Sequence, residues 1–385
     1  MKIVAIIPTL NEAENVEFIT KIIDKGLKKI SGNPNVTIIN ADSGSTDNTQ
    51  QIFLNTKTYF PKKAISYTKV NWGKGRNIYE VLRIFRKSVD YYLMFDADVT
   101  SVKIEWINKL LKPLLNQKAD LVVPIYKRNR YEGNTTNHFS SPIIYSCFGK
   151  YIAQPIAGDF AFTKKLASMV YKSFLSSSDY GYGVDTLITW TALLNNLKID
   201  QVKLGKKIHK PSFSKIIPMF QEVSNTTFNL INRNRFSLVN NLSEKSQIYS
   251  ENQIIDDKFI RKPSSSSLDA VTKYIEDNFQ IVENLKFINK NSLLKITRIH
   301  TNEWSRILTE CLFYILNTKI GKCQLDKISA AFTILYLERV LGYFEDINNL
   351  SENDVSRLLL KQRKLIRRNI LKKTDVINNN IWRKL

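Results

Sequence analysis

The 385-residue chain lacks any long hydrophobic run. No stretch approaches the roughly 20 apolar residues that cross a bilayer, and Pro8 ends the apolar stretch Lys2–Ile7, which predicts a short strand and not a signal peptide. Cysteine is also scarce: Cys147, Cys311 and Cys323 are widely spaced, which argues against a disulfide framework and against a zinc cluster. We therefore expect a cytoplasmic protein with buried, inert thiols.

Acidic residues are few relative to basic ones, since 35 Asp and Glu face 57 Lys and Arg, for a net charge of +22 at pH 7. Such a surface attracts a polyanion, whether nucleic acid, an anionic membrane or a phosphorylated substrate. The sequence has no recognisable RNA- or DNA-binding motif, so we expect no nucleic-acid partner. The basic segment Lys361–Lys373 predicts either a solvated helix face or a peripheral contact with anionic lipid or an acidic partner.

Short runs rich in Val and Ile alternate with helical patterns in the first half of the chain, as where Ile3–Ile7 precedes Val16–Lys29. This alternation predicts βα units around a mostly parallel, buried sheet. The second half shows helical periodicity, and residues 253–268, with their serine tract, predict a mobile loop. We therefore expect an α/β domain over residues 1–223 and a mostly α-helical domain over 224–385.

Polar turns follow the first two expected strands. The first is Pro8-Thr9-Leu10-Asn11-Glu12, and the second contains Asp42, Ser43 and Gly44. Ligands of open α/β sheets bind beyond the carboxyl ends of the strands, so both turns could contact a nucleoside. Each turn alone is equally consistent with a simple strand-to-helix connection.

A basic, glycine-containing turn, Gly73-Lys74-Gly75-Arg76, follows the strand-like segment Ser66–Val70 and opens a helix. Two glycines allow close approach of the backbone, and cations near a helix N-terminus suit a diphosphate. The turn lacks the Walker A pattern GxxxxGK[ST], which argues against a P-loop NTPase.

The strongest local signal is Asp96-Ala97-Asp98, directly after the apolar segment Tyr91–Phe95. In an extended chain the two carboxylates point to opposite faces, so a bend at the strand end must bring them to one ligand. One carboxylate could then hold a ribose. The other could hold a divalent cation that neutralises the diphosphate of a sugar nucleotide.

Two later segments combine small residues, aromatics and carboxylates in expected loops: Gln154–Phe160 and Asp179–Asp185. This composition suits a sugar site, although turn glycines and a helix cap would give the same pattern. His209 lies within the basic cluster Lys206–Lys210, whose charges favour the neutral, metal-ligating form of the imidazole. Taken alone, His209 would be a surface histidine.

Seven segments occur in a fixed order over residues 1–223: PTLNEAEN, DSGSTDNT, GKGRN, FDADVTS, QPIAGDFAF, SDYGYGVDTL and GKKIHKP. Together they resemble the GT-A, family 2-like glycosyltransferases that use nucleotide-diphospho-sugars. Within that group the chain is most similar to the mannosylglycerate synthases and the glucosyl-3-phosphoglycerate synthases. The first four segments are shared by many transferases, whereas QPIAGDF, YGYGVDTL and the isolated histidine are more specific.

The resemblance implies a role for each matching residue. Donor-binding residues would be Pro8, Leu10, Glu12, Asp42, Ser43, Lys74, Asp96 and Ile156. Acceptor-binding residues would be Arg128, Arg130, Thr135, Thr136, Gly158, Asp159 and Asp185. Catalytic residues would be Lys74, Asp98 and Asp185, and the ligands of Mg²⁺ or Mn²⁺ would be Asp98 and His209.

The implied reaction is metal-dependent transfer of a hexose, with retention, from GDP-mannose or UDP-glucose to a small hydroxy acid. The phosphoglycerate enzymes carry an Arg where this chain has Asn134, and loss of that bidentate anion partner favours an unphosphorylated acid such as D-glycerate over 3-phosphoglycerate. The product could be a compatible solute, and we expect a homodimer. Alternatives are an inverting family 2 enzyme acting on a polyprenyl phosphate or glycan, and a basic nucleic-acid-binding protein without activity.

Overall fold

The computed structural model describes residues 1–66, 73–175, 181–210, 213–242, 254–258, 260–288 and 297–382, without the side chains of 241 and 375–382. The chain forms two compact units. The first comprises residues 1–127 and 154–211, and the second comprises residues 128–153 and 212–385. Most of the expected strand Ser66–Val70 lies outside the described residues, as does Asp179.

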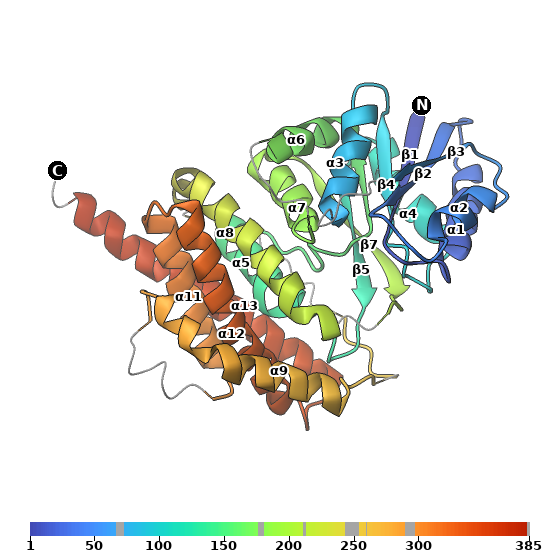
Figure 1. The fold of residues 1–385 in the computed structure, drawn as a ribbon. Coiled ribbons are helices and arrows are strands. Elements are labelled where there is room, and N and C mark those ends of the chain that lie inside the picture. The colour runs from blue at the N-terminus through green and yellow to red at the C-terminus, as the bar shows by residue number, and fades with distance from the viewer. Residues whose placement is uncertain are drawn as a thin grey trace. The chain divides into compact units, whose positions relative to one another are not determined.

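The first unit is built on a seven-stranded sheet with the order β3-β2-β1-β4-β6-β5-β7 (Figure 1). Its strands are β1 (Lys2–Thr9), β2 (Asn35–Asp42), β3 (Lys62–Ser66), β4 (Tyr91–Met94), β5 (Leu121–Lys127), β6 (Phe160–Thr163) and β7 (Ile199–Lys206). Strand β6 is antiparallel to its neighbours β4 and β5, and the other pairs are parallel. The α/β class predicted from the sequence is confirmed.

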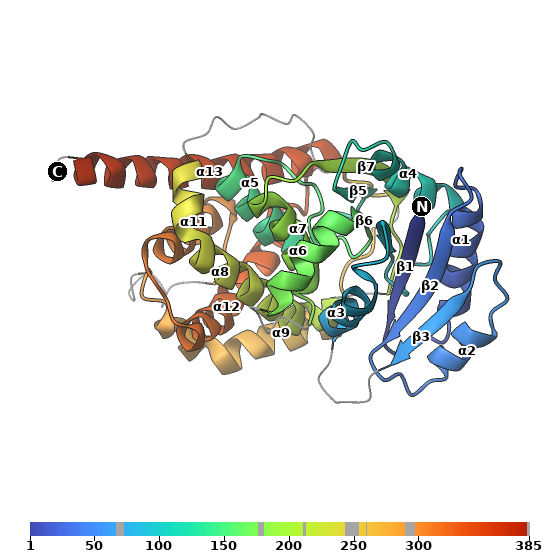
Figure 2. The same ribbon diagram turned by 90° about the horizontal axis from the view of Figure 1, so that it is seen from above.

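Helices cover both faces of this sheet. They are α1 (Val16–Lys28), α2 (Thr49–Asn55), α3 (Lys74–Phe85), α4 (Ile104–Leu115), α6 (Lys164–Leu175) and α7 (Val184–Leu194). Helices α1 and α4 pack on each other on one face, and α3, α6 and α7 lie together on the other (Figures 1 and 2). The apolar spacing of α1 explains why it packs on the sheet, because Val16, Ile19, Ile23 and Leu27 recur at three- and four-residue intervals and are all buried.

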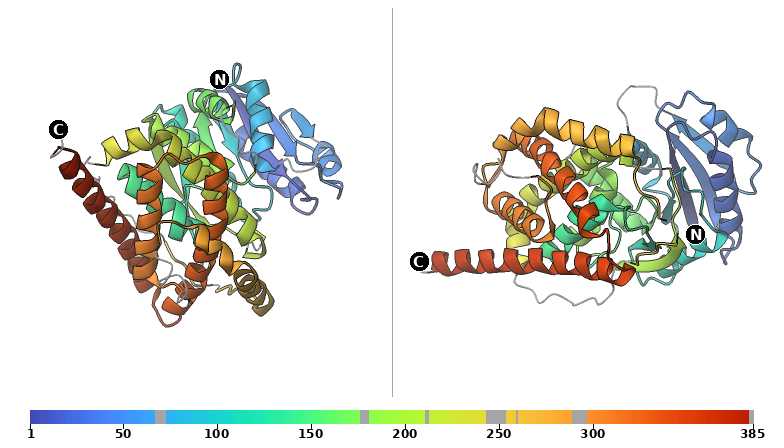
Figure 3. Two further views of the ribbon diagram at one scale, coloured as in Figure 1. Left: turned by 60° about the vertical axis from the view of Figure 1, so that its left-hand side comes forward. Right: turned by 90° about the horizontal axis from the view of Figure 1, so that it is seen from below.

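The second unit is helical, as predicted for the later part of the chain. Its elements are η1 (Thr136–Ser140), α5 (Ser141–Phe148), η2 (Phe213–Lys215), α8 (Ile216–Asn241), α9 (Ser265–Asn278), η3 (Phe279–Asn284), α11 (Thr301–Asn317), α12 (Lys322–Asp346) and α13 (Glu352–Trp382). Helix α13, the long red helix of Figure 3, packs along α5 and α11. The loop expected at 253–268 in fact contains the start of α9, because Ser264 accepts a hydrogen bond from the backbone N–H of Ser267 and caps that helix.

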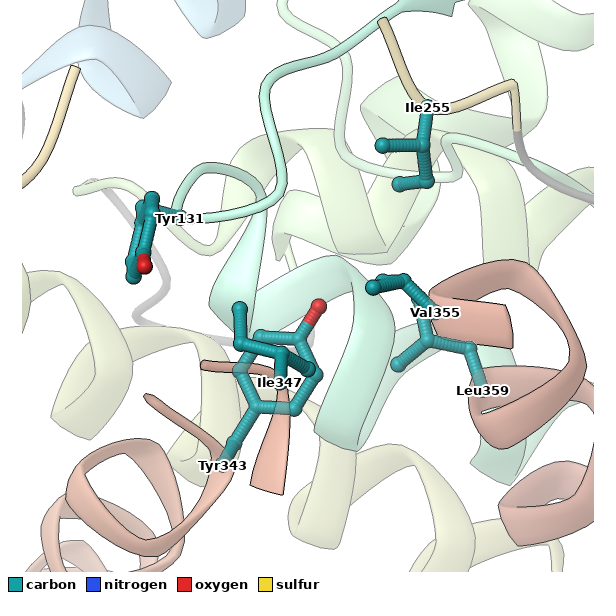
Figure 4. Close-up of a cluster of buried hydrophobic side chains, with 6 residues drawn as sticks. All are labelled: Tyr131, Ile255, Tyr343, Ile347, Val355 and Leu359. Carbon is teal, nitrogen blue, oxygen red and sulfur yellow. The ribbon is translucent and has the colours of Figure 1, made fainter. Parts of the chain in front are cut away.

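Residues 128–153 belong to the helical unit because their apolar side chains are buried there. Tyr131 lies in a cluster with Ile255, Tyr343 and Ile347, which Val355 and Leu359 complete (Figure 4). The compact units thus differ from the division expected after residue 223. That division remains a prediction about independently folding domains.

Helix α13 splits the basic segment 361–373 into two faces. Arg363 and Arg367 are buried: the guanidinium of Arg363 lies 3.7 Å from the ring centroid of Tyr151, and Arg367 donates hydrogen bonds to carbonyls in the last turn of α5. The exposed cations are Lys361, Lys364, Arg368 and Lys372. A solvated face therefore accounts for only part of this segment.

Two expectations about composition can be compared with the structure. Cys147 and Cys311 are buried free thiols, as predicted, but Cys323 is exposed because it lies in the first turn of α12. Within the described ranges, no helix combines the length and the apolar character needed to cross a membrane.

Candidate active site

The two predicted nucleoside turns meet at the carboxyl edge of the sheet, where Thr9 of β1 pairs with Asp42 of β2. Asp42 is buried, and its carboxylate accepts hydrogen bonds from the hydroxyls of Thr9 and Ser45 and from two backbone N–H groups. It therefore shapes the turn. Ser43, which is half-buried, accepts a hydrogen bond at 2.7 Å from the amide of Asn77 in α3.

The first turn presents side chains of different character. Pro8 is buried, Leu10 is 56% exposed, and Glu12 is half-buried. The carboxylate of Glu12 accepts a hydrogen bond at 3.0 Å from Lys210, which follows β7. The start of the chain and the predicted metal segment around His209 are thus joined by an ion pair.

Lys74 forms the centre of the site, between two carboxylates. Its Nζ lies 2.7 Å from Oδ1 of Asp96 and 3.0 Å from Oδ1 of Asp185. Burial lowers the pKa of Lys74, but the charges of Asp185 and Asp96 outweigh burial and raise it above its ordinary value. The ammonium therefore stays charged at neutral pH.

Local structure brings these three side chains together. Lys74 is the first residue of α3, and Asp185 lies in the first turn of α7, where the helix dipole favours a carboxylate. The N–H of Gly75 donates a hydrogen bond at 3.1 Å to the carbonyl of Gly181, which joins the two helix starts. The backbone bends after β4, so Asp96 reaches Lys74.

Asp96 is held ionised by its neighbours. Burial disfavours its charged form, but Lys74 and Lys207 outweigh this effect and hold its pKa at about 2. The pKa of Asp185 is raised by burial, although Lys74 opposes the rise. The two carboxylates that flank Lys74 therefore differ in their acidity.

Asp159 forms hydrogen bonds with two members of this cluster, Asp96 and Lys207. It is fully buried: Oδ1 accepts a hydrogen bond from the N–H of Asp96, and Oδ2 accepts from Tyr126 at 2.6 Å and from Lys207 at 2.7 Å. Each oxygen of this carboxylate thus has a partner within the protein, and the acceptor-binding role of Asp159 remains a prediction. The adjacent Gly158 has φ of +83°, which permits its close approach to Asp96.

Asp98 differs from the other carboxylates. In the part of the chain that the structure describes, it has no hydrogen bond or ion pair. Burial raises its pKa to about 6, and the charge of Asp96 adds to the rise. A carboxylate surrounded by like charge is stabilised by a bound cation.

His209 is held next to the turn that follows Asp98. The carbonyl of Ile208 accepts a hydrogen bond from the N–H of Thr100 at 2.9 Å, and its N–H donates to Ser101 at 2.8 Å. Nδ1 of His209 lies 2.7 Å from the carbonyl of Lys210 and donates a proton to it, so a metal would be bound through Nε2.

The residues present fit a divalent cation that completes its shell with ligand oxygens. No three His, Cys, Asp or Glu side chains of the described residues gather into a metal cluster. Mg²⁺ is commonly bound through one or two carboxylates together with substrate phosphates. Asp98 matches that pattern, and His209 would add an imidazole nitrogen.

The acceptor residues predicted around position 130 belong to the second unit. Arg130 donates to the carboxylate of Asp257 and to the carbonyls of Ile347 and Leu350, so its guanidinium is committed to the helical core. Thr135 is hydrogen-bonded to the hydroxyl of Tyr336 at 2.9 Å. The acceptor-binding role of Arg130 remains a prediction, and its partner Asp257 is too distant in sequence to be recognised by spacing.

The other predicted residues of these loops differ in their burial. Thr136 is buried in η1, Arg128 is half-buried, and its backbone pairs with Ile255. Ile156 is half-buried in the loop before β6. Sequence reasoning missed Tyr126 as a partner of the site and assigned Lys207 only to a general basic cluster. The one signal for Lys207 was its position two residues before the isolated His209.

Residues 4–175 match the model of Glycosyl transferase family 2. No curated protein sequence matches the chain significantly.

Solved structures with a similar fold include glucosyl-3-phosphoglycerate synthase from Mycobacterium tuberculosis in complex with phosphoglyceric acid. It shares 23% identity, with 60% of this chain and 79% of that chain covered and a TM-score of 0.48. The same enzyme in complex with Mn²⁺, UDP and glucosyl-3-phosphoglycerate shares 24% identity, with coverage of 60% and 79% and a TM-score of 0.47.

The family match spans the strands and turns that carry Lys74, Asp96 and Asp98. It agrees with the resemblance found in the sequence. Residues 4–175 therefore form a glycosyltransferase family 2 domain.

Proposed function

We propose that this enzyme transfers a hexose from a nucleotide-diphospho-sugar to a small hydroxy acid, with a divalent cation and with retention at the anomeric carbon. The observation that carries the proposal is the position of Lys74 between Asp96 and Asp185, in the same cluster as the unpaired Asp98. Lys74, Asp96 and Asp98 all lie in the segment that matches the family.

Lys74 is suited to stabilise the leaving diphosphate. An ammonium has three N–H groups, and Asp96 and Asp185 occupy two of them. The third can donate to a diphosphate oxygen as negative charge develops there. Because the two carboxylates fix Lys74, little reorganisation is needed when the donor binds.

Asp98 and His209 would hold the divalent cation, which supplies Lewis-acid stabilisation of the diphosphate when it is bound. Asp96, kept ionised by Lys74 and Lys207, would accept hydrogen bonds from the ribose hydroxyls. Asp185 would orient a hydroxyl of the sugar or acceptor. The oxygen of the acceptor hydroxyl would then bond to the anomeric carbon on the face from which the diphosphate leaves, and the hydroxyl proton would pass to an oxygen of that leaving diphosphate.

D-Glycerate is our proposed acceptor, ahead of 3-phosphoglycerate. Asn134 stands where the phosphoglycerate enzymes carry an Arg, and its amide donates to the carbonyl of Tyr131. Arg130, the neighbouring candidate, is bound to Asp257. Fewer guanidinium groups in this loop favour a carboxylate over a phosphate as the anion to be bound.

A substrate matrix tests the proposal. UDP-glucose and GDP-mannose are each incubated with D-glycerate or 3-phosphoglycerate and Mg²⁺ or Mn²⁺, and release of the nucleoside diphosphate is measured. We expect release that depends on acceptor and cation, with a product whose NMR coupling shows retention. Inversion at the anomeric carbon, or preference for 3-phosphoglycerate, would contradict the corresponding part of the proposal.

A further inference from the structure

Lys207 carries a role that the sequence did not assign. We propose that Lys207 is a positioning residue that neutralises Asp96, together with Lys74, and thereby reserves Asp98 for the divalent cation. The inference rests on the proposed function, because it concerns the same cation. It gives different roles to the carboxylates of Asp96 and Asp98, which a single residue separates in the sequence.

The surroundings of Lys207 are those of a fixed charge. Its side chain is 4% exposed, and its Nζ donates hydrogen bonds at 2.7 Å to Oδ2 of Asp159 and at 2.7 Å to the carbonyl of Ala157. The same nitrogen lies 3.6 Å from Oδ2 of Asp96. The ammonium group of Lys207 therefore cannot rotate out into solvent.

Lys207 and Lys74 approach Asp96 on different oxygens. Lys74 lies against Oδ1 and Lys207 against Oδ2, so both oxygens face a cation of the protein itself. Asp98 has neither contact within the described part of the chain. A divalent cation entering the cluster thus meets one carboxylate whose two oxygens already face ammonium groups, and one that has no ion pair among the described residues.

The charge balance of the cluster agrees with this division. Four carboxylates, those of Asp96, Asp98, Asp159 and Asp185, face two ammonium groups, so full ionisation leaves a formal charge of −2. One divalent cation would balance that charge. Removing the charge of Lys207 would leave an excess of negative charge and free one oxygen of Asp96.

Two nearly isosteric substitutions in the buried pair of Lys207 and Asp159 should have opposite effects on the affinity for Mn²⁺. Lys207→Met should bind Mn²⁺ at least threefold more tightly in the absence of donor, because repulsion is removed, yet turn over at least tenfold more slowly, because Asp96 becomes a competing ligand. Asp159→Asn should bind Mn²⁺ at least threefold more weakly. A merely structural role for the pair would weaken binding in both variants.

The test is titration of donor-free protein with Mn²⁺, followed by electron paramagnetic resonance, with kcat and KM for the donor measured in parallel. The double variant Lys207→Met/Asp159→Asn should return to the wild-type Mn²⁺ affinity, and Lys207→Arg should do the same. The matched control is Lys203→Met, which changes an exposed lysine of β7, the strand that ends just before Lys207, and should alter neither quantity.

The outcomes separate this inference from the proposed function. A folded Lys207→Met variant that binds Mn²⁺ no more tightly than wild type overturns the role of Lys207 alone. Wild-type protein that binds no Mn²⁺ and releases no nucleoside diphosphate overturns the proposed function. If thermal melting shows that Lys207→Met does not fold, Asp159→Asn decides, and unchanged or tighter binding overturns the inference.

Discussion

A Cβ atom at Gly158 would lie 1.7 Å from Oδ2 of Asp96. The loop before β6 therefore passes so close to the carboxylate of Asp96 that no side chain fits between them. Gly158 also has φ of +83°, which other residues rarely adopt. A side chain at this position must displace Asp96 from Lys74 and Lys207.

Gly158→Ala should lower turnover at least tenfold and destabilise the protein by more than about 1 kcal/mol, from backbone strain and the clash together. Gly32→Ala is the matched control, because Gly32 has φ of +87° and no neighbouring atom within 4 Å of its Cβ position. Kinetics and thermal unfolding of both variants check this. Equal turnover in the two would show that contact with Asp96 is unimportant.

Lys74→Ala should lower turnover more than tenfold, a loss of about 1.4 kcal/mol or more in transition-state stabilisation. The variant leaves Asp96 and Asp185 close together without their shared cation, so donor affinity should fall as well. Lys63→Ala, which removes an exposed lysine from β3, serves as the control. Normal kcat in Lys74→Ala would rule out its role at the diphosphate.

Asp98→Asn and His209→Ala should each abolish the part of the turnover that depends on added Mg²⁺ or Mn²⁺, with the melting temperature preserved. Asp90→Asn, at the opposite end of β4, should keep full activity because Asp90 only accepts a hydrogen bond from the N–H of Lys2. Removal of metal with EDTA should mimic the site variants. Near-normal turnover in EDTA would refute the metal assignment.

The sequence predicted the parts of this site that depend on local pattern. The apolar strand before Asp96, the turns at Pro8 and Asp42, and the helix that begins near Lys74 all follow from residues within a few positions of one another. Because the strands are parallel, their polar ends had to share one edge.

The rest depended on pairs distant in sequence. Lys207 meets Asp159 across 48 positions, and Arg130 meets Asp257 across 127. A buried ion pair of this kind has no periodicity or spacing that marks it. Both Asp159 and Arg130 were therefore predicted to bind the acceptor, because the sequence does not show that a charged residue in a loop has a partner within the protein.

Asp346→Asn should destabilise the helical unit by about 2 kcal/mol, since charge-assisted hydrogen bonds of buried groups are worth roughly 1.5–3 kcal/mol. Asp346 accepts hydrogen bonds from the fully buried Arg339 at 2.8 Å, from Thr301 and from His300. Burial opposes ionisation, but these bonds hold the pKa of Asp346 below its ordinary value.

A depressed carboxylate pKa adds stability above the unfolded-state pKa of about 4, and that stability is lost as the pH falls through the folded-state value. The difference in unfolding free energy between wild type and Asp346→Asn should thus be largest at pH 7 and decrease below about pH 4. Asp354→Asn, in an exposed pair with Arg357, should have a smaller effect. A constant gap from pH 7 to pH 3 would contradict the assignment.

The exposed cations of α13 should bind anionic vesicles. Lys361, Lys364, Arg368 and Lys372 recur at intervals of three or four residues, so they form one stripe along the helix. Each cation near an anionic surface contributes about 1 kcal/mol. Wild-type protein should therefore sediment with vesicles that contain phosphatidylglycerol, and not with vesicles of phosphatidylcholine alone.

Substitution of all four stripe residues by Gln should abolish that sedimentation. The matched control replaces four exposed lysines of the first unit, Lys25, Lys29, Lys112 and Lys118, which lowers the net charge equally and should leave sedimentation intact. Equal loss in both variants would show that net charge, and not the stripe, is responsible. If wild-type protein does not sediment with anionic vesicles, the stripe has no membrane role.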